Sequence, residues 1–126
     1  MPTYSENGKN SYTAAAAVVK GNILKFSGST DAAGLPSVTP TTDAADAAIA
    51  VALTDANAGE KVAVKILGSG GTTPVIAGGA VTVGAQIAAD GTATAADTDV
   101  IIGRALSAAT AANDLIEVAT QVAQVK

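Results

Sequence analysis

Three pairs of carboxylates are the residues of this 126-residue chain whose type and spacing could support acid–base chemistry. The pairs are Asp43 with Asp46, Asp97 with Asp99, and Asp55 with Glu60. Two carboxylates facing one cleft can act as general acid and general base, or as acid and nucleophile. Each pair stands in a predicted loop or turn, where aspartate normally bonds to nearby backbone amides. We therefore interpret all three pairs as turn residues.

The chain has few other residues that could catalyse a reaction or bind a ligand. The chain has no histidine and no cysteine, so it cannot build a Ser-His-Asp or Cys-His arrangement or a disulfide. The "DTD" stretch at 97–99 lacks the further oxygen ligands of a calcium loop. The "GSGGTT" stretch at 68–73 lacks the lysine of a phosphate-binding loop, so we interpret it as a linker. The sequence predicts a protein that is not an enzyme and has no cofactor, metal site or catalytic residue.

The apolar composition predicts a thin core. Hydrophobic residues make up 48% of the chain, but many are alanine, and the aromatic residues are only Tyr4, Tyr12 and Phe26. Alanine contributes little apolar area, whereas a large side chain contributes roughly 1.5–3 kcal/mol when fully buried. Small or thin cores are often supplemented by a metal, a disulfide or a partner subunit. With the first two excluded, subunit association is the expected supplement.

The charge pattern bears on partners and location. The net charge is −4 and the lysines are scattered, whereas nucleic-acid binders concentrate cations in a patch. No run approaches the roughly 18 apolar residues of a membrane helix. The polar start "MPTYSENGKNSYT" lacks the apolar segment of a signal peptide. We expect a soluble protein made in a cytoplasm, without nucleic-acid or membrane partners.

Short apolar runs separated by Gly-rich turns predict a mostly β domain, a small barrel or sandwich, over residues 14–126. Residues 1–13 are polar and aperiodic and predict a flexible N-terminal arm. Residues 28–46 form a Pro- and Thr-rich loop, in which Pro36 and Pro40 argue against a central strand.

Residues 48–66 give the clearest local pattern. "AIAVALT" and "KVAVKIL" are apolar runs joined by the turn "DANAGE", and the second run alternates with period two. We predict a β-hairpin, although the alanines before it would also suit a helix from Asp43.

In the C-terminal half, "VIIGRAL" and "LIEVAT" predict strands, with Gly103 at a bulge or close approach and Asp90-Gly91 at a tight turn. Arg104 is expected to form a structural ion pair with Glu117 or Asp114.

The N-terminal arm holds the candidate binding residues. Two of the three aromatics lie there, and aromatic side chains are enriched at interface hot spots. The residues predicted to contact a partner are Tyr4, Asn7, Lys9 and Tyr12.

The order of three segments from residue 48 to 118, "GEKVAVKILG", "GGAVTVGAQIAADGTATA" and "VIIGRALSAATAANDLIEV", resembles the small head decoration, or cement, proteins of tailed bacteriophages. The resemblance implies a mostly β structural protein without catalytic residues. It also implies binding to the major capsid protein on the outside of the expanded head, often as homotrimers at three-fold or quasi-three-fold positions. The alternative is a bacterial surface or adhesin-like β binding module.

Overall fold

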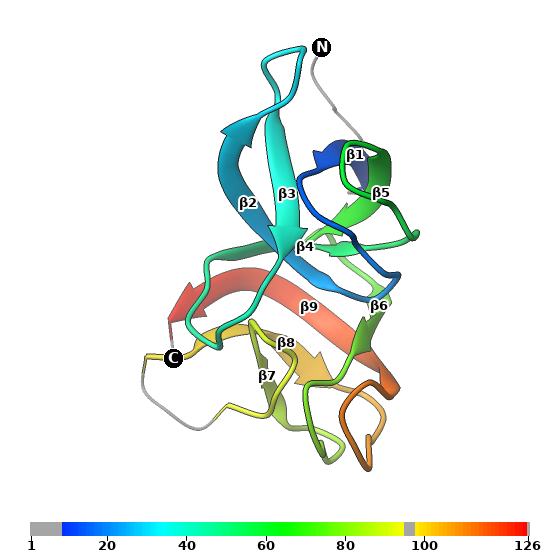
Figure 1. Ribbon diagram of the computed structural model, residues 1–126. Coiled ribbons are helices and arrows are strands. Elements are labelled where there is room, and N and C mark those ends of the chain that lie inside the picture. Colours follow the sequence, from blue (N-terminus) through cyan, green and yellow to red (C-terminus); the bar gives the residue numbers. More distant parts are fainter. Residues whose placement is uncertain (1–8, 95–97, 126) are drawn as a thin grey trace.

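The computed structural model describes residues 9–94 and 98–125, and all regular secondary structure in them is β. Five strands close into a barrel and four form a second sheet beside it (Figure 1). The barrel strands are β1 (Lys9–Ala14), β2 (Ile23–Thr30), β3 (Pro36–Pro40), β4 (Ala48–Ala52) and β5 (Lys61–Ile66). The sheet strands are β6 (Thr72–Ile76), β7 (Gln86–Ala88), β8 (Val100–Ala105) and β9 (Leu115–Val125). The mostly β, small-barrel fold predicted from the sequence is confirmed.

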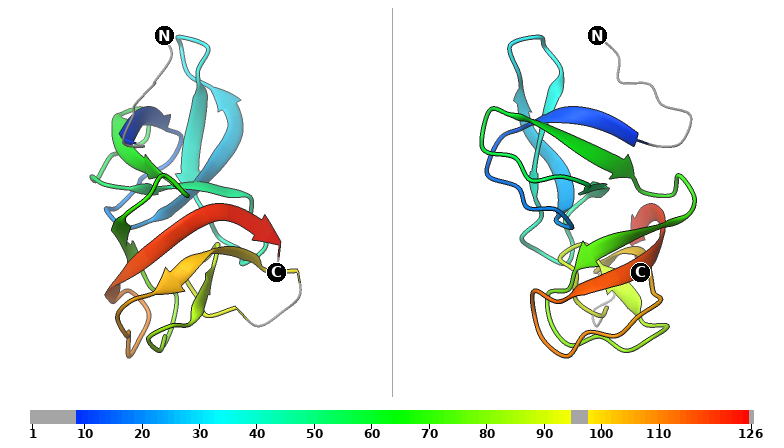
Figure 2. Two further views of the ribbon diagram at one scale, coloured as in Figure 1. Left: turned by 180° about the vertical axis from the view of Figure 1, so that it is seen from behind. Right: turned by 90° about the vertical axis from the view of Figure 1, so that its right-hand side faces the viewer.

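The barrel closes through β1, in the order β1-β3-β2-β4-β5. β1 pairs antiparallel with β5, which lies beside it in the right-hand view of Figure 2. The register runs from Lys9 opposite Lys65 to Thr13 opposite Lys61. β1 also pairs parallel with β3, at Thr13 and Ala14 only. Residues 9–13, which the sequence analysis placed in the arm, therefore belong to a barrel strand. The rest of the predicted arm, residues 1–8, lies outside the described residues.

The expectation that prolines keep residues 36–40 out of a central strand is wrong. β3 lies between β1 and β2, and its Val38 is fully buried. The prolines occupy its first and last positions, opposite Thr30 and Leu24 of β2, so the missing N–H groups fall at the strand ends. The β2–β3 connection forms the tip of the molecule farthest from the second sheet (Figure 1).

The hairpin predicted at residues 48–66 is confirmed as β4 and β5. They pair antiparallel, with Ala50 opposite Ile66 and Ala52 opposite Val64. The connecting turn is held to the barrel by the Ala56 N–H, which donates to the Val18 carbonyl oxygen at 2.9 Å. Tertiary pairing thus overrides the helix-forming tendency of the alanines.

The second sheet has the order β6-β9-β8-β7. The long β9, red in Figure 2, therefore lies inside the sheet and pairs with both β6 and β8. Pro74 is accommodated because β6 is an edge strand. Gly103 sits at a register shift between β8 and β9, where a Cβ would clash with the Ala119 carbonyl oxygen. The predicted irregularity at Gly103 is confirmed.

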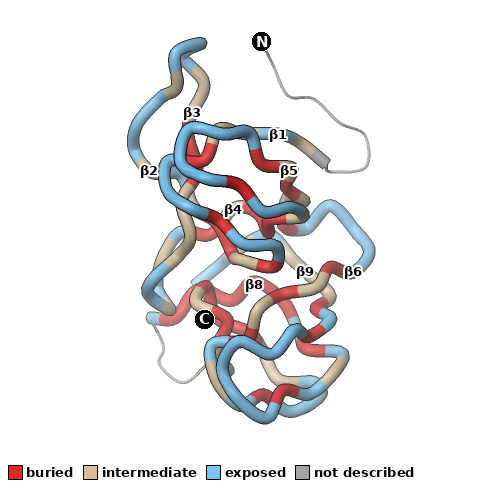
Figure 3. Tube along the Cα trace, turned by 45° about the vertical axis from the view of Figure 1, so that its right-hand side comes forward, coloured by how far each residue is buried: buried red, intermediate tan, exposed pale blue. Residues whose placement is uncertain are grey.

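Two apolar clusters hold the fold together, and buried segments run through both parts of the tube in Figure 3. One fills the barrel and includes Leu24, Val38, Val62 and Val64. The other joins Ile23 and Val51 on the outside of the barrel to the inner face of the sheet, including Ile87, Ile102, Ile116 and Val118. The barrel and the sheet therefore share a core. No helix in the described part of the chain is long and apolar enough to cross a membrane.

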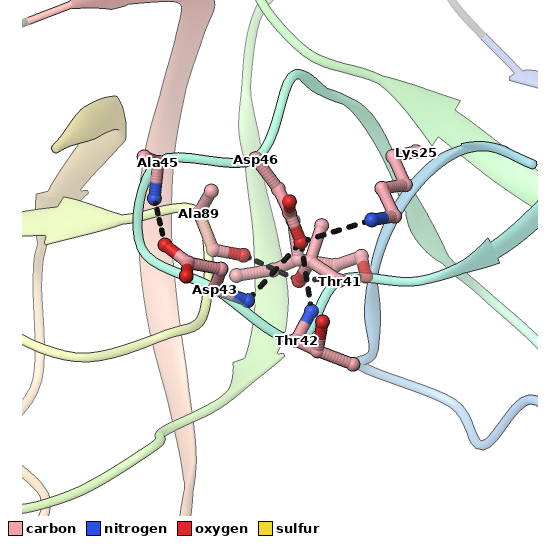
Figure 4. A network of polar contacts seen from close by, with 8 residues as sticks. Lys25, Thr41, Thr42, Asp43, Ala45, Asp46 and Ala89 are labelled. Carbon is pink, nitrogen blue, oxygen red and sulfur yellow. Dashed lines mark hydrogen bonds and ion pairs between the residues drawn. The ribbon is translucent and has the colours of Figure 1, made fainter. Parts of the chain in front are cut away.

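The connection between β3 and β4 ties the barrel to the sheet through polar contacts (Figure 4). The Thr41 hydroxyl donates to the Ala89 carbonyl oxygen at 2.5 Å. One oxygen of Asp46 accepts hydrogen bonds from the Thr42 and Asp43 N–H groups and lies 3.2 Å from the Lys25 ammonium. This loop therefore has a defined structure, in which the Asp46 carboxylate organises the turn.

Candidate interaction surface

The carboxylates singled out in the sequence serve the backbone. Asp43 accepts a hydrogen bond from the Ala45 N–H at 2.9 Å, and Asp55 accepts one from the Lys20 N–H at 2.7 Å. Glu60 accepts a bond from the Asn57 N–H at 2.7 Å. These contacts agree with turn roles and assemble no pair of reacting groups. Asp97 lies outside the described residues, while Asp99 is buried.

Three aspartates have pKa values below the ordinary aspartate range because backbone amides bond to the ionised form. The Leu35 N–H and the Thr13 hydroxyl lower the pKa of Asp31. The Thr42 N–H lowers the pKa of Asp46. The N–H groups of Thr110 and Ala111 lower the pKa of Asp114. Among the described residues, no three acidic side chains lie together as a metal site built from carboxylates would require. The geometry therefore indicates structural roles for these groups.

Arg104 does not form the ion pair expected from the sequence within the described part of the chain. Its guanidinium donates to the Gly84 carbonyl oxygen at 3.0 Å, on the outer surface of the sheet. The ion pairs recorded among the described residues join Lys25 to Asp46 and Lys61 to Asp31.

An apolar groove of about 380 Å³ lies at one mouth of the barrel. We call it the mouth groove. Barrel residues form most of its wall, and the end of β9 closes one side. Its lining residues are Tyr12, Phe26, Ala48, Ile49, Ile66, Leu67, Val122 and Ala123.

The aromatic rings of Tyr12 and Phe26 meet in this groove at a centroid distance of 5.8 Å and an interplanar angle of 79°. The edge-to-face arrangement places a positive ring edge against a negative ring face. Phe26 keeps 45% of its surface exposed although it is one of only three aromatics in the chain. An exposed aromatic pair in an apolar hollow is typical of a contact surface.

The β9 wall of the groove depends on Gly68. This residue has φ +80°, and a Cβ there would lie 2.7 Å from the Val122 backbone nitrogen. Only glycine suits that conformation and that close approach. Val122, which the loop supports, keeps 70% of its surface exposed.

Two of the four predicted contact residues, Lys9 and Tyr12, belong to the described part of the chain. Tyr12 lines the mouth groove, and the backbone of Lys9 pairs with Lys65, next to Ile66 of the groove. Tyr4 and Asn7 lie outside the described residues. The sequence analysis missed Phe26 and Val122. No sequence signal shows that the barrel opens beside Phe26.

A second apolar surface lies on the outer face of the sheet, and we call it the sheet patch. Ile116 and Val118 point into the core, so the alternate residues Leu115 and Glu117 point outward. Ile76 pairs with Leu115, and the Leu106 N–H donates to the Glu117 carbonyl oxygen at 2.8 Å. Leu115 and Leu106 are more than half exposed.

Comparison with known proteins bears directly on the role of these surfaces. The sequence matches the family described as phage cement protein over residues 5–120. The chain belongs to the phage cement protein family. Its barrel and sheet are those of a structural protein of the bacteriophage virion, and the family supports a capsid-associated role. The resemblance inferred from residues 48–118 is thereby confirmed.

A solved structure shares this fold. The crystal structure of the N base of the head fibre gp8.5 in bacteriophage phi29 superposes with a TM-score of 0.68. The two proteins are 19% identical, and the alignment covers 94% of this cement protein and 97% of that chain. At 19% sequence identity, the structural similarity shows that the two proteins share a fold. No curated protein matches the sequence.

Proposed function

We propose that this cement protein binds the outer surface of the expanded phage head as trimers, at three-fold or quasi-three-fold positions of the major capsid protein, and stabilises the shell. The observation that carries the proposal is the family match over residues 5–120. The shared fold with the base of a phage head fibre supports it. The carboxylates bound to backbone amides fit a role in binding rather than catalysis.

The stabilisation would arise from mass action. A protein that binds only the assembled, expanded lattice lowers the free energy of that lattice by its binding free energy. The effect is repeated at every site of the shell, so a modest contact becomes large in sum. No covalent chemistry is needed.

The N-terminal residues 1–8 provide the contact with the shell in this proposal, through Tyr4 and Asn7, with Lys9 and Tyr12 at the start of the barrel. β1 begins at Lys9, whose backbone pairs with that of Lys65, next to the groove residue Ile66. An extended segment can add a strand to an exposed sheet edge of the partner.

Co-sedimentation with phage heads tests the proposal. The purified protein is mixed with expanded, undecorated heads of its own phage and, in parallel, with unexpanded proheads. Saturable pelleting with expanded heads alone is the expected result. No pelleting with expanded heads would overturn the capsid role and favour the adhesin-like alternative.

A truncation tests the part played by the N-terminal segment. Deleting residues 2–8 leaves every barrel strand complete, whereas a deletion through residue 13 would remove most of β1. We expect the shorter deletion to abolish pelleting while the circular dichroism spectrum stays that of the intact protein. Unchanged affinity for expanded heads would exclude the segment as the main contact.

A further inference from the structure

We propose that a calcium ion binds in a small polar hollow between the barrel and the second sheet, which we call the junction site. The hollow has a volume of about 140 Å³. Its wall includes Asn22 and Thr41 from barrel connections, and Asp90 and Asn113 from connections of the second sheet. This inference goes beyond the proposed function, because it concerns an ion bound by the folded domain and not the contact with the phage head.

Asp90 gives the junction site a negative charge that no lysine or arginine offsets. One of its carboxylate oxygens accepts hydrogen bonds from the Thr92 N–H at 3.1 Å and from the Thr92 hydroxyl at 2.6 Å. Within the described part of the chain, the other oxygen has no hydrogen bond, and no cationic side chain lies within 4 Å of either oxygen. A half-buried carboxylate with one open oxygen is a suitable ligand for a hard cation.

Neutral oxygens line the same hollow. The Thr41 hydroxyl donates its proton to the Ala89 carbonyl oxygen (Figure 4), so the lone pairs of its oxygen stay available to a cation. The side-chain amide of Asn113 has no hydrogen bond to another described residue. Calcium accepts hydroxyl, amide and carbonyl oxygens together with carboxylates, and waters complete its shell of about six to eight ligands. The junction site therefore needs no cluster of acidic side chains, which the described residues lack.

Backbone contacts hold the loops of the junction site in place. The Asn113 N–H donates to the Ala77 carbonyl oxygen at 2.8 Å, and the Gly78 N–H donates to the Gly91 carbonyl oxygen at 3.0 Å. A Cβ on Gly78 would lie 2.7 Å from the Asp90 carbonyl oxygen, so glycine allows the two segments to approach this closely. Asn113 has φ +74° and is the non-glycine residue with a positive φ in the described part of the chain. Such a backbone conformation is costly and is often found at functional sites.

The size and charge of the junction site favour calcium over magnesium. The hollow of about 140 Å³ is far larger than the roughly 10–15 Å³ that one water requires, so an ion and several waters fit. Magnesium demands near-octahedral geometry and gives up its waters reluctantly, whereas calcium accepts an irregular set of oxygens. With one carboxylate the dissociation constant should lie at about 0.1–1 mM, as in the weaker class of calcium sites. The bound ion would connect Thr41 of the barrel to Asp90 of the sheet.

Thermal unfolding of the full chain in metal-free buffer, with and without 10 mM calcium chloride (a concentration of about ten times the weaker expected dissociation constant), tests the site. Calcium should raise the midpoint by about 3–8 °C, and the same concentration of magnesium chloride by less than half as much. Asp90→Asn should abolish the calcium-dependent rise. Asp55→Asn is the matched control, because Asp55 is a turn carboxylate outside the hollow that accepts a hydrogen bond from the Lys20 N–H, and it should keep the rise. No rise in the unaltered protein, or an equal rise in Asp90→Asn, would overturn the proposal.

Two substitutions at Asn113 separate its side chain from its backbone conformation. Asn113→Gly suits the positive φ and removes the amide oxygen, so the domain should stay folded without calcium while its calcium affinity falls by about fivefold or more. Asn113→Asp adds a second carboxylate and should raise the affinity by about fivefold, because calcium affinity rises with ligand charge. Isothermal titration calorimetry with calcium chloride measures all three proteins. The expected order of affinity is Asn113→Asp, then the unaltered protein, then Asn113→Gly, and any other order would overturn the junction site as drawn.

Discussion

Tyr12 and Phe26 touch edge to face across the mouth of a barrel in which their strands are not neighbours. The ring centroids are 5.8 Å apart, yet β1 pairs with β3 and β5, while β2 pairs with β3 and β4. The ring contact therefore joins two strands that share no backbone hydrogen bonds and that both pair with β3.

A double-mutant cycle should measure this contact. Tyr12→Leu and Phe26→Leu keep apolar bulk but remove the ring geometry, and we expect a coupling free energy of about 0.5–1.5 kcal/mol between them. Urea unfolding of the four proteins gives the value. Val19→Ala, at an exposed position outside the groove, should change stability by less than about 0.5 kcal/mol. A coupling free energy of zero would mean that the contact between the two rings does not contribute to stability.

Substitution at Gly103 should be far more costly than substitution at Gly79. A Cβ on Gly103 would clash with the Ala119 carbonyl oxygen and lie 2.8 Å from Val118 Cγ1, whereas a Cβ on Gly79 would meet nothing within 4 Å. We expect Gly103→Ala to lower the free energy of unfolding by about 1–3 kcal/mol, because the β8–β9 ladder must shift. Gly79→Ala should be within about 0.5 kcal/mol of the unaltered protein. Equal urea midpoints for the two variants would contradict this account.

The sequence predicted elements with strong local patterns and failed where tertiary pairing decides the outcome. The alternation of Val62, Val64 and Ile66 is a period-two signal, and Gly103 inside an apolar run indicated an irregular strand. β3 was missed because its five residues contain two prolines and one large apolar side chain, Val38. Its place in the barrel depends on both neighbours, which no local pattern reveals.

The candidate surface was only partly predictable for a related reason. Aromatic scarcity drew attention to Tyr12, which does line the groove. Phe26 and Val122 are separated by almost a hundred residues, and both line the groove because the end of β9 reaches the barrel mouth. The Gly68 approach that allows this contact is a backbone relationship between the β5–β6 connection and β9. A single sequence carries no record of such long-range contacts.

Truncation of Val38 tests whether β3 is part of the core in solution. Val38 is fully buried in the barrel cluster, so Val38→Ala should cost about 1.5–3 kcal/mol from lost apolar burial and the cavity left behind. The same change at the exposed Val19 is the matched control. A cost below about 0.5 kcal/mol at position 38 would indicate that residues 36–40 do not pack as a strand.

Acid should destabilise the domain through the turn aspartates, and Asp46 is the most informative of them. The Thr42 N–H, then the Asp43 N–H and Lys25, favour its ionised form, so its pKa is lower in the folded than in the unfolded chain. A carboxyl whose folded pKa is depressed contributes stability above its unfolded pKa, and this contribution is lost as the pH falls through the folded value. Stability should therefore be flat near neutral pH and fall below about pH 4.

Asp46→Asn separates this contribution from those of other carboxyls. The amide keeps the shape of the side chain and one acceptor oxygen but has no charge to pair with Lys25. We expect a loss of about 1 kcal/mol at pH 7 that shrinks towards zero at the acid end, with the two stability curves converging. Urea unfolding from pH 2.5 to 7 measures both curves. A constant offset at every pH would show that the carboxylate acts only through its shape, and that its charge does not stabilise the β3–β4 loop.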